Sequence, residues 1–233
     1  MAAQQPKSDL VLLDVFGSPF AQRVRIALAE KGLAYERAEE DLFAKSDLLL
    51  RSNPIQQKIP VLLHAGRGPV CESLAILQYL DDAFPATRRL LPAAADPYER
   101  ARARFWAEYS DRAHSCGKRL WMTTRDGDGH EEARAELLRV LRAMDAELGD
   151  REFFGGEEAG FGYVDAAAAP FAAWFRVYER YGGFSVAEEC PRLAAWAARC
   201  ARQGSVADNV YAPDKVCELV ELYKQRVLGQ QAR

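Results

Sequence analysis

The chain lacks both a long apolar run and an excess of positive charge. No stretch of its 233 residues approaches the ~20 consecutive apolar residues that a membrane helix needs. The 31 Lys and Arg residues are outnumbered by 34 Asp and Glu residues, which gives a formal net charge of -3, whereas nucleic-acid binding depends on a surplus of cations. Residues 1–9 are polar and lack the apolar stretch of a secretory signal. The sequence therefore predicts a cytoplasmic protein with neither a membrane nor a nucleic acid as partner.

Cysteine and histidine are few and scattered. The cysteines form no Cys-x-x-Cys pair, so the sequence predicts neither a disulfide framework nor a dithiol redox site. We interpret them as small buried apolar side chains. The histidines have no spacing that places two ligands on one face, so we expect no metal site and no cofactor. The cysteines are Cys71, Cys116, Cys190, Cys200 and Cys217, and the histidines are His64, His114 and His130.

The first third of the chain alternates between strand and helix patterns. Residues 10–16 form an apolar run that predicts a buried strand ending in a turn. A helix follows, because Ser18 is a good N-cap, Pro19 suits the first helical position and Gly32 is a typical stop. Residues 34–40 predict a second strand, parallel to the first in a βαβ unit.

A second group of elements completes this part. A short helix is expected over residues 46–52, a strand over 59–64, and a hairpin turn at 66–69 that leads into another short strand. A further helix opens at Glu72-Ser73. We therefore expect a first domain over residues 8–85 with a small sheet and helices.

The sequence predicts a linker and then helices for the rest of the chain. Residues 84–95 contain two prolines and no sustained period, which is typical of a linker. Beyond them, apolar residues recur at helical spacing, including one stripe from Phe171 to Tyr178 and another from Val216 to Val227. The predicted fold class is α+β: a mixed N-terminal domain followed by an all-α domain over residues 96–228.

Ser18 stands where a strand passes into a helix. The unpaired N–H groups and the dipole of a helix N-terminus favour negative charge, such as a thiolate. A hydroxyl that donates a hydrogen bond to the sulfur adds to this effect. A shift of one unit in the thiol pKa requires only ~1.4 kcal/mol. Taken alone, a simple N-cap remains the commoner explanation for a serine here.

Two further features suggest a site for a peptide ligand. Pro60 heads a strand after the polar Gln57-Lys58 turn, and an X-Pro bond adopts the cis form at a cost of only ~0.5–1 kcal/mol. An ordinary edge-strand proline explains it nearly as well. Glu72-Ser73 opens a helix, which can hold a carboxylate, although a solvated cap explains an isolated Glu-Ser pair. The order and spacing of the three features are more informative than any one of them.

The chain resembles the cytosolic glutathione transferases, and within them the plant tau class. The resemblance spans nearly the whole chain and implies a thioredoxin-like first domain. At residue 162 a glycine stands where many relatives outside the tau class have a Ser or Thr as the helix cap. The segments that carry the resemblance are residues 18–24, 40–42 with 45–46, 52–54, 58–62, 70–73 with Ile76 and 78–79, and 161–165.

The resemblance implies an enzyme that conjugates the thiolate of reduced glutathione to small hydrophobic electrophiles, a detoxification reaction, as a homodimer. It implies Ser18 as the catalytic hydroxyl, Lys45 at the glycine carboxylate, Ile59 on the cysteinyl backbone and Glu72-Ser73 at the γ-glutamyl end. Phe20 and Lys58 complete the expected glutathione site. For the electrophile we expect Phe16, Phe20, Trp106, Tyr109, Trp174 and Tyr178, with Phe175 as a further candidate, although aromatic stripes are more often core.

Two other functions use the same scaffold. A thiol transferase or dehydroascorbate reductase needs a nucleophilic cysteine at the start of the first helix, where this chain has Ser18. A binding protein, such as a ligand carrier or the transferase-like domain of an elongation factor gamma subunit, needs no turnover. The intact set of Ser18, Lys45 and Glu72-Ser73 argues against a lost site, but a ligand-carrying role stays open.

Overall fold

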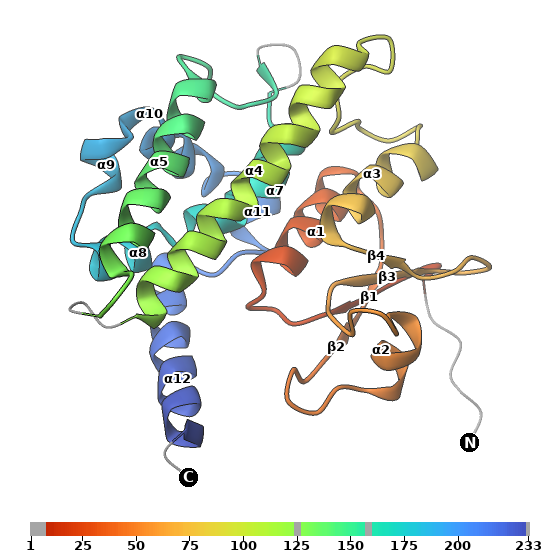
Figure 1. Cartoon of the computed structure of the whole chain (residues 1–233). Coiled ribbons are helices and arrows are strands. Elements are labelled where there is room, and N and C mark those ends of the chain that lie inside the picture. The colour runs from red at the N-terminus through yellow and green to blue at the C-terminus, as the bar shows by residue number, and fades with distance from the viewer. Residues whose placement is uncertain (1–7, 124–126, 157–159, 232–233) are drawn as a thin grey trace.

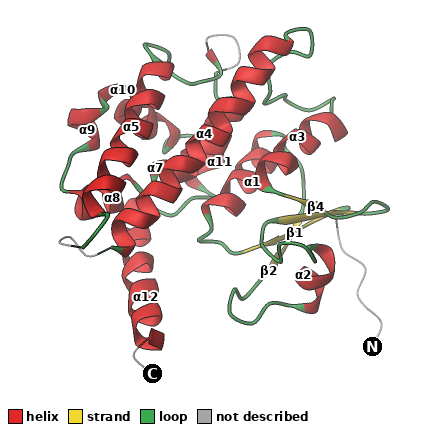
Figure 2. Ribbon diagram, in the orientation of Figure 1, coloured by secondary structure: helices red, strands yellow, loops and turns green. Residues whose placement is uncertain are grey.

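The computed structural model describes residues 8–123, 127–156 and 160–231, with side chains to residue 226. It contains a small sheet with helices, followed by a larger all-helical part (Figure 1). All of the strands among the described residues lie in the N-terminal part (Figure 2). Within the described residues, no helix is long and apolar enough to cross a membrane.

The sheet has the strand order β2-β1-β3-β4. Its strands are β1 (Leu10–Asp14), β2 (Glu36–Glu39), β3 (Val61–His64) and β4 (Val70–Cys71). β1 pairs with β2 in parallel, while β3 runs antiparallel to both β1 and β4. The predicted strands and the parallel βαβ unit are therefore confirmed.

Helix α1 (Pro19–Glu30) begins and ends where its sequence signals predict. The Ser18 side chain caps its first turn. At the other end Gly32 has a φ of +64°, and the N–H of Leu33 reaches back to the carbonyl of Leu28 at 3.0 Å. This is a Schellman ending, which favours glycine because a Cβ strains the left-handed conformation. The chain then turns directly into β2.

Two more helices complete the N-terminal part. α2 (Asp47–Ser52) lies on one side of the sheet, and α3 (Ser73–Ala83) joins α1 on the other (Figure 1). Asp81, a buried residue of α3, binds the linker that follows this helix. Its carboxylate accepts hydrogen bonds from the Lys31 ammonium at 2.9 Å and from the N–H groups of Leu90 and Leu91. The linker is therefore anchored to the first domain.

The helical part wraps around α4 and α7, and α7 packs against α1. The predicted stripe from Phe171 to Tyr178 is divided between two helices. Pro170 lacks the N–H for an i−4 bond, and Trp174 then bonds to Phe171 in an i−3 turn at 3.0 Å. The elements are α4 (Pro97–Met122), α5 (His130–Leu148), α7 (Tyr163–Ala172), α8 (Phe175–Gly182), α9 (Val186–Glu189), α10 (Pro191–Cys200), α11 (Gly204–Ala207) and α12 (Pro213–Gln231).

Asp165 organises the start of α7. Its buried carboxylate accepts hydrogen bonds from the backbone N–H groups of Phe154, Gly155 and Gly162 at 2.9–3.1 Å and from the Trp196 indole at 2.7 Å. Gly162 is the N-cap, as expected. Four donors offset the cost of burying this carboxylate. Asp165 therefore joins α7, α10 and the loop before α7.

Gly117 allows α4 and α8 to approach closely. A Cβ at this position lies 2.1 Å from the ring of Tyr178, whose side chain is fully buried. Although Ala is favoured over Gly within a helix by about 1 kcal/mol, overpacking costs about 1–3 kcal/mol. We therefore expect Gly117→Ala to lower the free energy of unfolding by about 1–2 kcal/mol, measured by urea denaturation.

Gly204→Ala provides the matched control. Gly204 begins α11, and no atom lies within 4 Å of a Cβ placed there. We expect this variant to match or slightly exceed the wild type in stability. Equal stability of the two variants would show that Tyr178 moves aside freely, contrary to the packing described.

Candidate active site

Ser18 occupies the turn between β1 and α1. Its N–H donates to Val15 O at 2.9 Å, and its Oγ accepts from the N–H of Ala21 at 3.4 Å. A hydroxyl has one donor and two acceptor positions. Among the described residues, the Ser18 hydroxyl has no acceptor for its own proton. Capping the helix and donating to a ligand are therefore compatible roles for Ser18.

The residues beside Ser18 are held rigidly. Arg25 donates to Asp14 at 2.5 Å and to the carbonyl of Phe16 at 2.7 Å, and its guanidinium lies 4.3 Å from the centre of the Phe16 ring. Tyr211 contacts the same ring at 4.6 Å. The structure thus places Phe16, predicted to meet the electrophile, in contacts that fix the turn before Ser18.

A cavity of about 280 Å³ lies beside this turn. It brings together the predicted glutathione residues Phe20, Lys58, Ile59, Glu72 and Ser73, and also Asn53, Gln56 and Pro60. Because Phe20 is the second residue of α1, the cavity adjoins the N-terminus that Ser18 caps. The lining therefore comes from three segments separated in sequence.

Asn53 holds the segment that carries Lys58 and Ile59. Its side-chain amide donates to Lys58 O at 3.0 Å, and its side-chain oxygen accepts from the N–H of Gln56 at 3.2 Å. The bond between Ile59 and Pro60 is cis. Sequence reasoning gave Asn53 no role, although it lies in the Ser52-Asn53-Pro54 motif.

Glu72 has an unusual backbone conformation. Its φ of 69° and ψ of 117° lie outside the regions that non-glycine residues favour. Such strain persists only where the surrounding structure enforces it, and it concentrates at functional sites. Glu72 makes no capping hydrogen bond to α3. Glu72 lines the cavity together with Lys58 and with Ser73 at the N-terminus of α3, so residues of both charges surround it.

Arg23 connects this cavity to the helical part. Its fully buried guanidinium donates to Ser73 Oγ at 3.1 Å, to Asp111 Oδ1 at 2.6 Å and to Ala167 O at 3.1 Å. Because Ser73 accepts from Arg23, its own hydroxyl proton is left for a ligand. Sequence reasoning assigned Arg23 no role, because a buried ion pair leaves no local pattern.

Lys45 lies apart from the predicted set. It is exposed in the loop between β2 and α2 and does not line the cavity. The structure brings Phe20, Lys58, Ile59, Glu72 and Ser73 to one cavity, with Ser18 in the adjoining turn, but leaves Lys45 outside this group.

Aromatic residues continue from Phe20 along the helical part. The Phe20 ring lies 5.5 Å from His114 and 5.8 Å from Phe171, and His114 lies 4.9 Å from Trp174. We call Phe20, His114, Phe171 and Trp174 the aromatic wall. Of these, the sequence predicted Phe20 and Trp174 as electrophile contacts and missed His114, which was considered only as a metal ligand.

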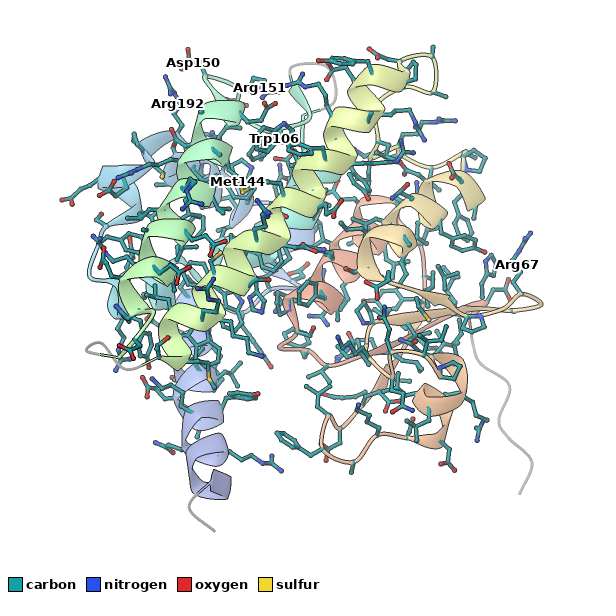
Figure 3. All side chains as sticks on the ribbon, viewed as in Figure 1. Arg67, Trp106, Met144, Asp150, Arg151 and Arg192 are labelled. Atoms are coloured by element: carbon teal, nitrogen blue, oxygen red, sulfur yellow. The ribbon has the colours of Figure 1, made fainter. Side chains whose placement is uncertain are left out.

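Four other predicted aromatic residues lie elsewhere. Trp106 and Tyr109 lie beside the exposed Phe105 on α4, and the centres of their rings are 5.2 and 5.8 Å from the centre of the Phe105 ring. Trp106 lines a separate cavity of about 370 Å³ with Arg151, and Figure 3 shows both at the upper end of α4 and α5. Tyr178 of α8 is 0% exposed and packs against Gly117 of α4. The centre of the Phe175 ring lies 6.4 Å from the centre of the Tyr178 ring.

The cysteines do not supply a thiolate. Burial raises the pKa of all five thiols, and Glu72 raises the pKa of Cys71 further. Cys116, Cys190 and Cys200 are buried as predicted, while Cys71 and Cys217 are half-buried. Because only the thiolate is nucleophilic, these groups do not favour a thiol-transfer mechanism.

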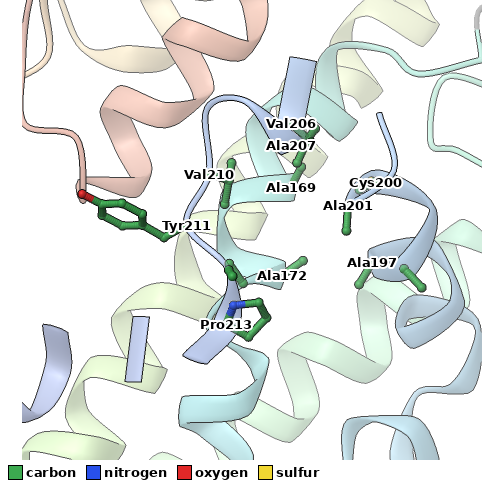
Figure 4. Close-up of a pocket in the computed structure, with 13 residues that line it drawn as sticks. Ala169, Ala172, Ala197, Cys200, Ala201, Val206, Ala207, Val210, Tyr211 and Pro213 are labelled. Atoms are coloured by element: carbon green, nitrogen blue, oxygen red, sulfur yellow. The ribbon is translucent and has the colours of Figure 1, made fainter. Parts of the chain in front are cut away.

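A second cavity, of about 440 Å³, lies between α7, α10 and the connection from α11 to α12 (Figure 4). Alanine side chains form most of its lining, with Tyr211 at its edge. Among the described residues no charged side chain lines it, so these residues do not balance the carboxylates of a peptide such as glutathione. The cavity beside Ser18 is the better match to that ligand.

The fold is that of a glutathione transferase. The chain matches the family models for the glutathione S-transferase N-terminal domain over residues 8–82 and the C-terminal domain over residues 127–199. It belongs to this family, and its first domain is thioredoxin-like.

Within the family the chain is a tau-class member. It is 59% identical over 227 residues to the probable glutathione S-transferase GSTU1 of Oryza sativa subsp. japonica, with 94% of this chain and 97% of that protein covered. The crystal structure of rice GST1 (OsGSTU1) in complex with glutathione matches with a TM-score of 0.88 and 58% identity, over 93% of this chain and 98% of that one. The structure of the tau-class MiGSTU of mango, Mangifera indica, matches with a TM-score of 0.83 and 37% identity, over 92% of this chain and 98% of that one.

Replacement of Arg23 tests its connecting role. Arg23→Met leaves Ser73, Asp111 and Ala167 O without their donor. Breaking a buried ion pair costs about 3–5 kcal/mol, but Asp111 is 33% exposed, so we expect a loss of about 2–3 kcal/mol in the free energy of unfolding. We also expect the KM for glutathione to rise several-fold, because Ser73 loses its fixed orientation.

Arg142→Met is the control. Arg142 pairs with Glu189 at an exposed position, where an ion pair contributes little, so both measurements should stay near the wild type. An unchanged KM in folded Arg23→Met would contradict the link from Arg23 to the cavity beside Ser18.

Proposed function

We propose that this protein conjugates the thiolate of reduced glutathione to small hydrophobic electrophiles and that Ser18 is its catalytic hydroxyl. The observation that carries the proposal is the free proton of Ser18 at the N-terminus of α1, beside a cavity with both signs of charge. Membership in the tau class supports the same activity.

The charges of the cavity complement those of glutathione, which has two carboxylates and one ammonium. Glu72 faces the ammonium of the γ-glutamyl unit, and Ser73 with the N-terminus of α3 holds its carboxylate. Lys58 provides a cation for the glycine carboxylate, which is the role that the resemblance assigned to Lys45. Ile59 pairs with the cysteinyl backbone. In this orientation the sulfur lies near Ser18.

The catalytic effect is electrostatic. A free thiol with a pKa near ~8.5 is mostly protonated at neutral pH. The dipole of α1 and the hydrogen bond from Ser18 both favour the thiolate, and each unit of pKa depression corresponds to ~1.4 kcal/mol. The sulfur then forms a C–S bond to the electrophile, and the leaving group departs with the bonding electron pair. Positioning and electrostatic stabilisation supply the rate enhancement.

The electrophile packs against the aromatic wall in this proposal. Phe20 borders both the glutathione cavity and the wall, so a substrate that contacts it lies close to the sulfur. Trp174 contributes the second predicted contact. The described arrangement favours Phe20 and Trp174 over Phe16, Trp106, Tyr109 and Tyr178.

Ser18→Ala tests the proposal directly. A hydrogen bond to a charged group contributes about 1.5–3 kcal/mol, so we expect kcat/KM for chlorodinitrobenzene to fall about tenfold to a hundredfold. Binding of glutathione should be mostly kept. Loss of the cap should also lower the free energy of unfolding by about 1 kcal/mol.

Two variants serve as controls. Ser185→Ala removes the N-cap of α9, away from the cavity, and should leave kcat/KM unchanged. Ser18→Cys, assayed for thiol transfer, tests the alternative chemistry. Wild-type protein without turnover would favour the binding-protein function, and full activity in Ser18→Ala would contradict the role of Ser18.

We also propose that the protein is a homodimer and that α4 provides part of the interface. Phe105 is 57% exposed and stacks with Tyr109, beside Trp106. Exposed aromatic clusters of this kind are favoured at protein interfaces. This arrangement offers Trp106 and Tyr109 a function other than electrophile binding.

A charge at Phe105 tests the interface. We expect sedimentation of the wild type to show a dimer and Phe105→Asp to shift it toward monomer, because burial of an unpaired carboxylate is costly. Leu222→Asp is the matched control: Leu222 is 59% exposed, but on α12, and this variant should remain dimeric. A monomeric wild type, or identical behaviour of the two variants, would exclude this interface.

The domain boundaries and the location remain predictions. The proposed domains are residues 8–85 and 96–228, supported by the family matches over 8–82 and 127–199. A cytoplasmic location is expected from the sequence.

A further inference from the structure

His114 is the polar member of the aromatic wall. Its ring is perpendicular to Phe20, stacks on Phe171 at 5.4 Å and meets Trp174 edge-on at 4.9 Å. Three aromatic rings from α1, α7 and the start of α8 therefore hold the imidazole in place. The orientation of His114 is set by packing alone.

Neither ring nitrogen of His114 has a hydrogen-bond partner among the described residues, and Nδ1 is buried. Buried polar atoms in proteins are nearly always paired, so an unpaired one needs an explanation. The residue as a whole is half-buried, and its ring contacts Phe20, which lines the cavity beside Ser18. The imidazole therefore has an unused donor and an unused acceptor at the wall.

The charge state of His114 is also set by its surroundings. Burial, together with the nearby cations Lys118 of α4 and Arg23 of α1, lowers the pKa of His114 from 6.5 to about 4. The other groups packed against the ring, Phe20, Phe171 and Trp174, do not carry charge. His114 is thus a neutral imidazole at physiological pH, with one N–H donor and one bare nitrogen.

We propose that His114 is a specificity-determining residue of the electrophile site, where its N–H donates a hydrogen bond to an oxygen acceptor on an aromatic electrophile that packs against Phe20. The proposal rests on the proposed conjugation reaction and narrows its substrate class to aromatic electrophiles with a nitro or carbonyl group. A site with an unused donor favours substrates that satisfy it, because a substrate without the acceptor leaves the donor unpaired.

Paired substrates isolate this hydrogen bond. We choose para-nitrobenzyl chloride and benzyl chloride, because the para position places the acceptor at the end of the ring away from the reacting carbon. In both reactions the glutathione sulfur forms the C–S bond, and chloride leaves with the electron pair of the C–Cl bond. His114→Phe keeps an aromatic ring in the wall but removes the donor, and His114→Gln restores an N–H.

We expect His114→Phe to lower kcat/KM for para-nitrobenzyl chloride by about threefold to tenfold, the range for one neutral hydrogen bond. The value for benzyl chloride should change less than about twofold, and the KM for glutathione should not change. His114→Gln should recover part of the selectivity. Equal losses with both substrates indicate a packing role and overturn the proposal, as does the absence of any loss.

A binding measurement separates this proposal from the conjugation reaction itself and does not require the Phe variant to fold. By calorimetry, wild-type protein should bind S-(para-nitrobenzyl)glutathione several-fold more tightly than S-benzylglutathione, with His114→Gln intermediate or equal to the wild type. Equal affinity of the wild type for the two compounds overturns the role of His114. If the wild type converts neither chloride, the conjugation reaction is contradicted. The calorimetric result then decides whether His114 donates the proposed hydrogen bond.

Discussion

Arg23 carries a positive charge into the junction of α1, α3, α4 and α7, and its three hydrogen bonds determine how the two parts of the chain meet. One bond fixes Ser73 at the cavity beside Ser18, the second pairs with Asp111 of α4, and the third reaches a backbone carbonyl of α7. A buried guanidinium is tolerated only when its donors are satisfied together. Because the acceptors come from both parts of the chain, the cavity beside Ser18 and the aromatic wall are held in one geometry by the same group. The Arg23 guanidinium also lies 5.3 Å from the centre of the Phe20 ring, so it contacts the residue that borders both sites.

The turn before α1 shows the same rigidity on a smaller scale. Arg25, Asp14 and Tyr211 fix Phe16, and the Ser18 side chain closes the first turn of the helix. A catalytic hydroxyl benefits from such support, because a misplaced donor loses most of its electrostatic effect. By contrast, the residues expected to meet the charged ends of glutathione, Lys58 and Glu72, are exposed. The reacting end of the site is therefore rigid, and its ligand-binding rim is open to solvent.

Much of this arrangement follows from local sequence signals. The strand and helix order, the Ser18 cap, the Gly32 ending and the proline at the third strand were predicted, because each depends on neighbouring residues. Periodicity also showed which aromatic residues share a helix face, but not what that face meets. Trp106 and His114 lie on the same long helix, yet one groups with exposed Phe105 and the other with Phe20. Long-range contacts leave no local pattern in the sequence, as with Arg23 and Asp111, which lie 88 residues apart. The break of the Phe171–Tyr178 stripe into two helices depended on how Pro170 is accommodated.

The account depends on stabilisation of a thiolate at the N-terminus of α1 by the Ser18 hydroxyl. The most direct measurement is a pH titration of the ultraviolet thiolate absorbance of glutathione bound to the wild type and to Ser18→Ala. The account predicts a pKa for the bound thiol at least one unit below that of free glutathione in the wild type, and a value closer to that of free glutathione in the variant. A bound thiol that titrates with the same pKa as free glutathione, or an equal depression in both proteins, would contradict it.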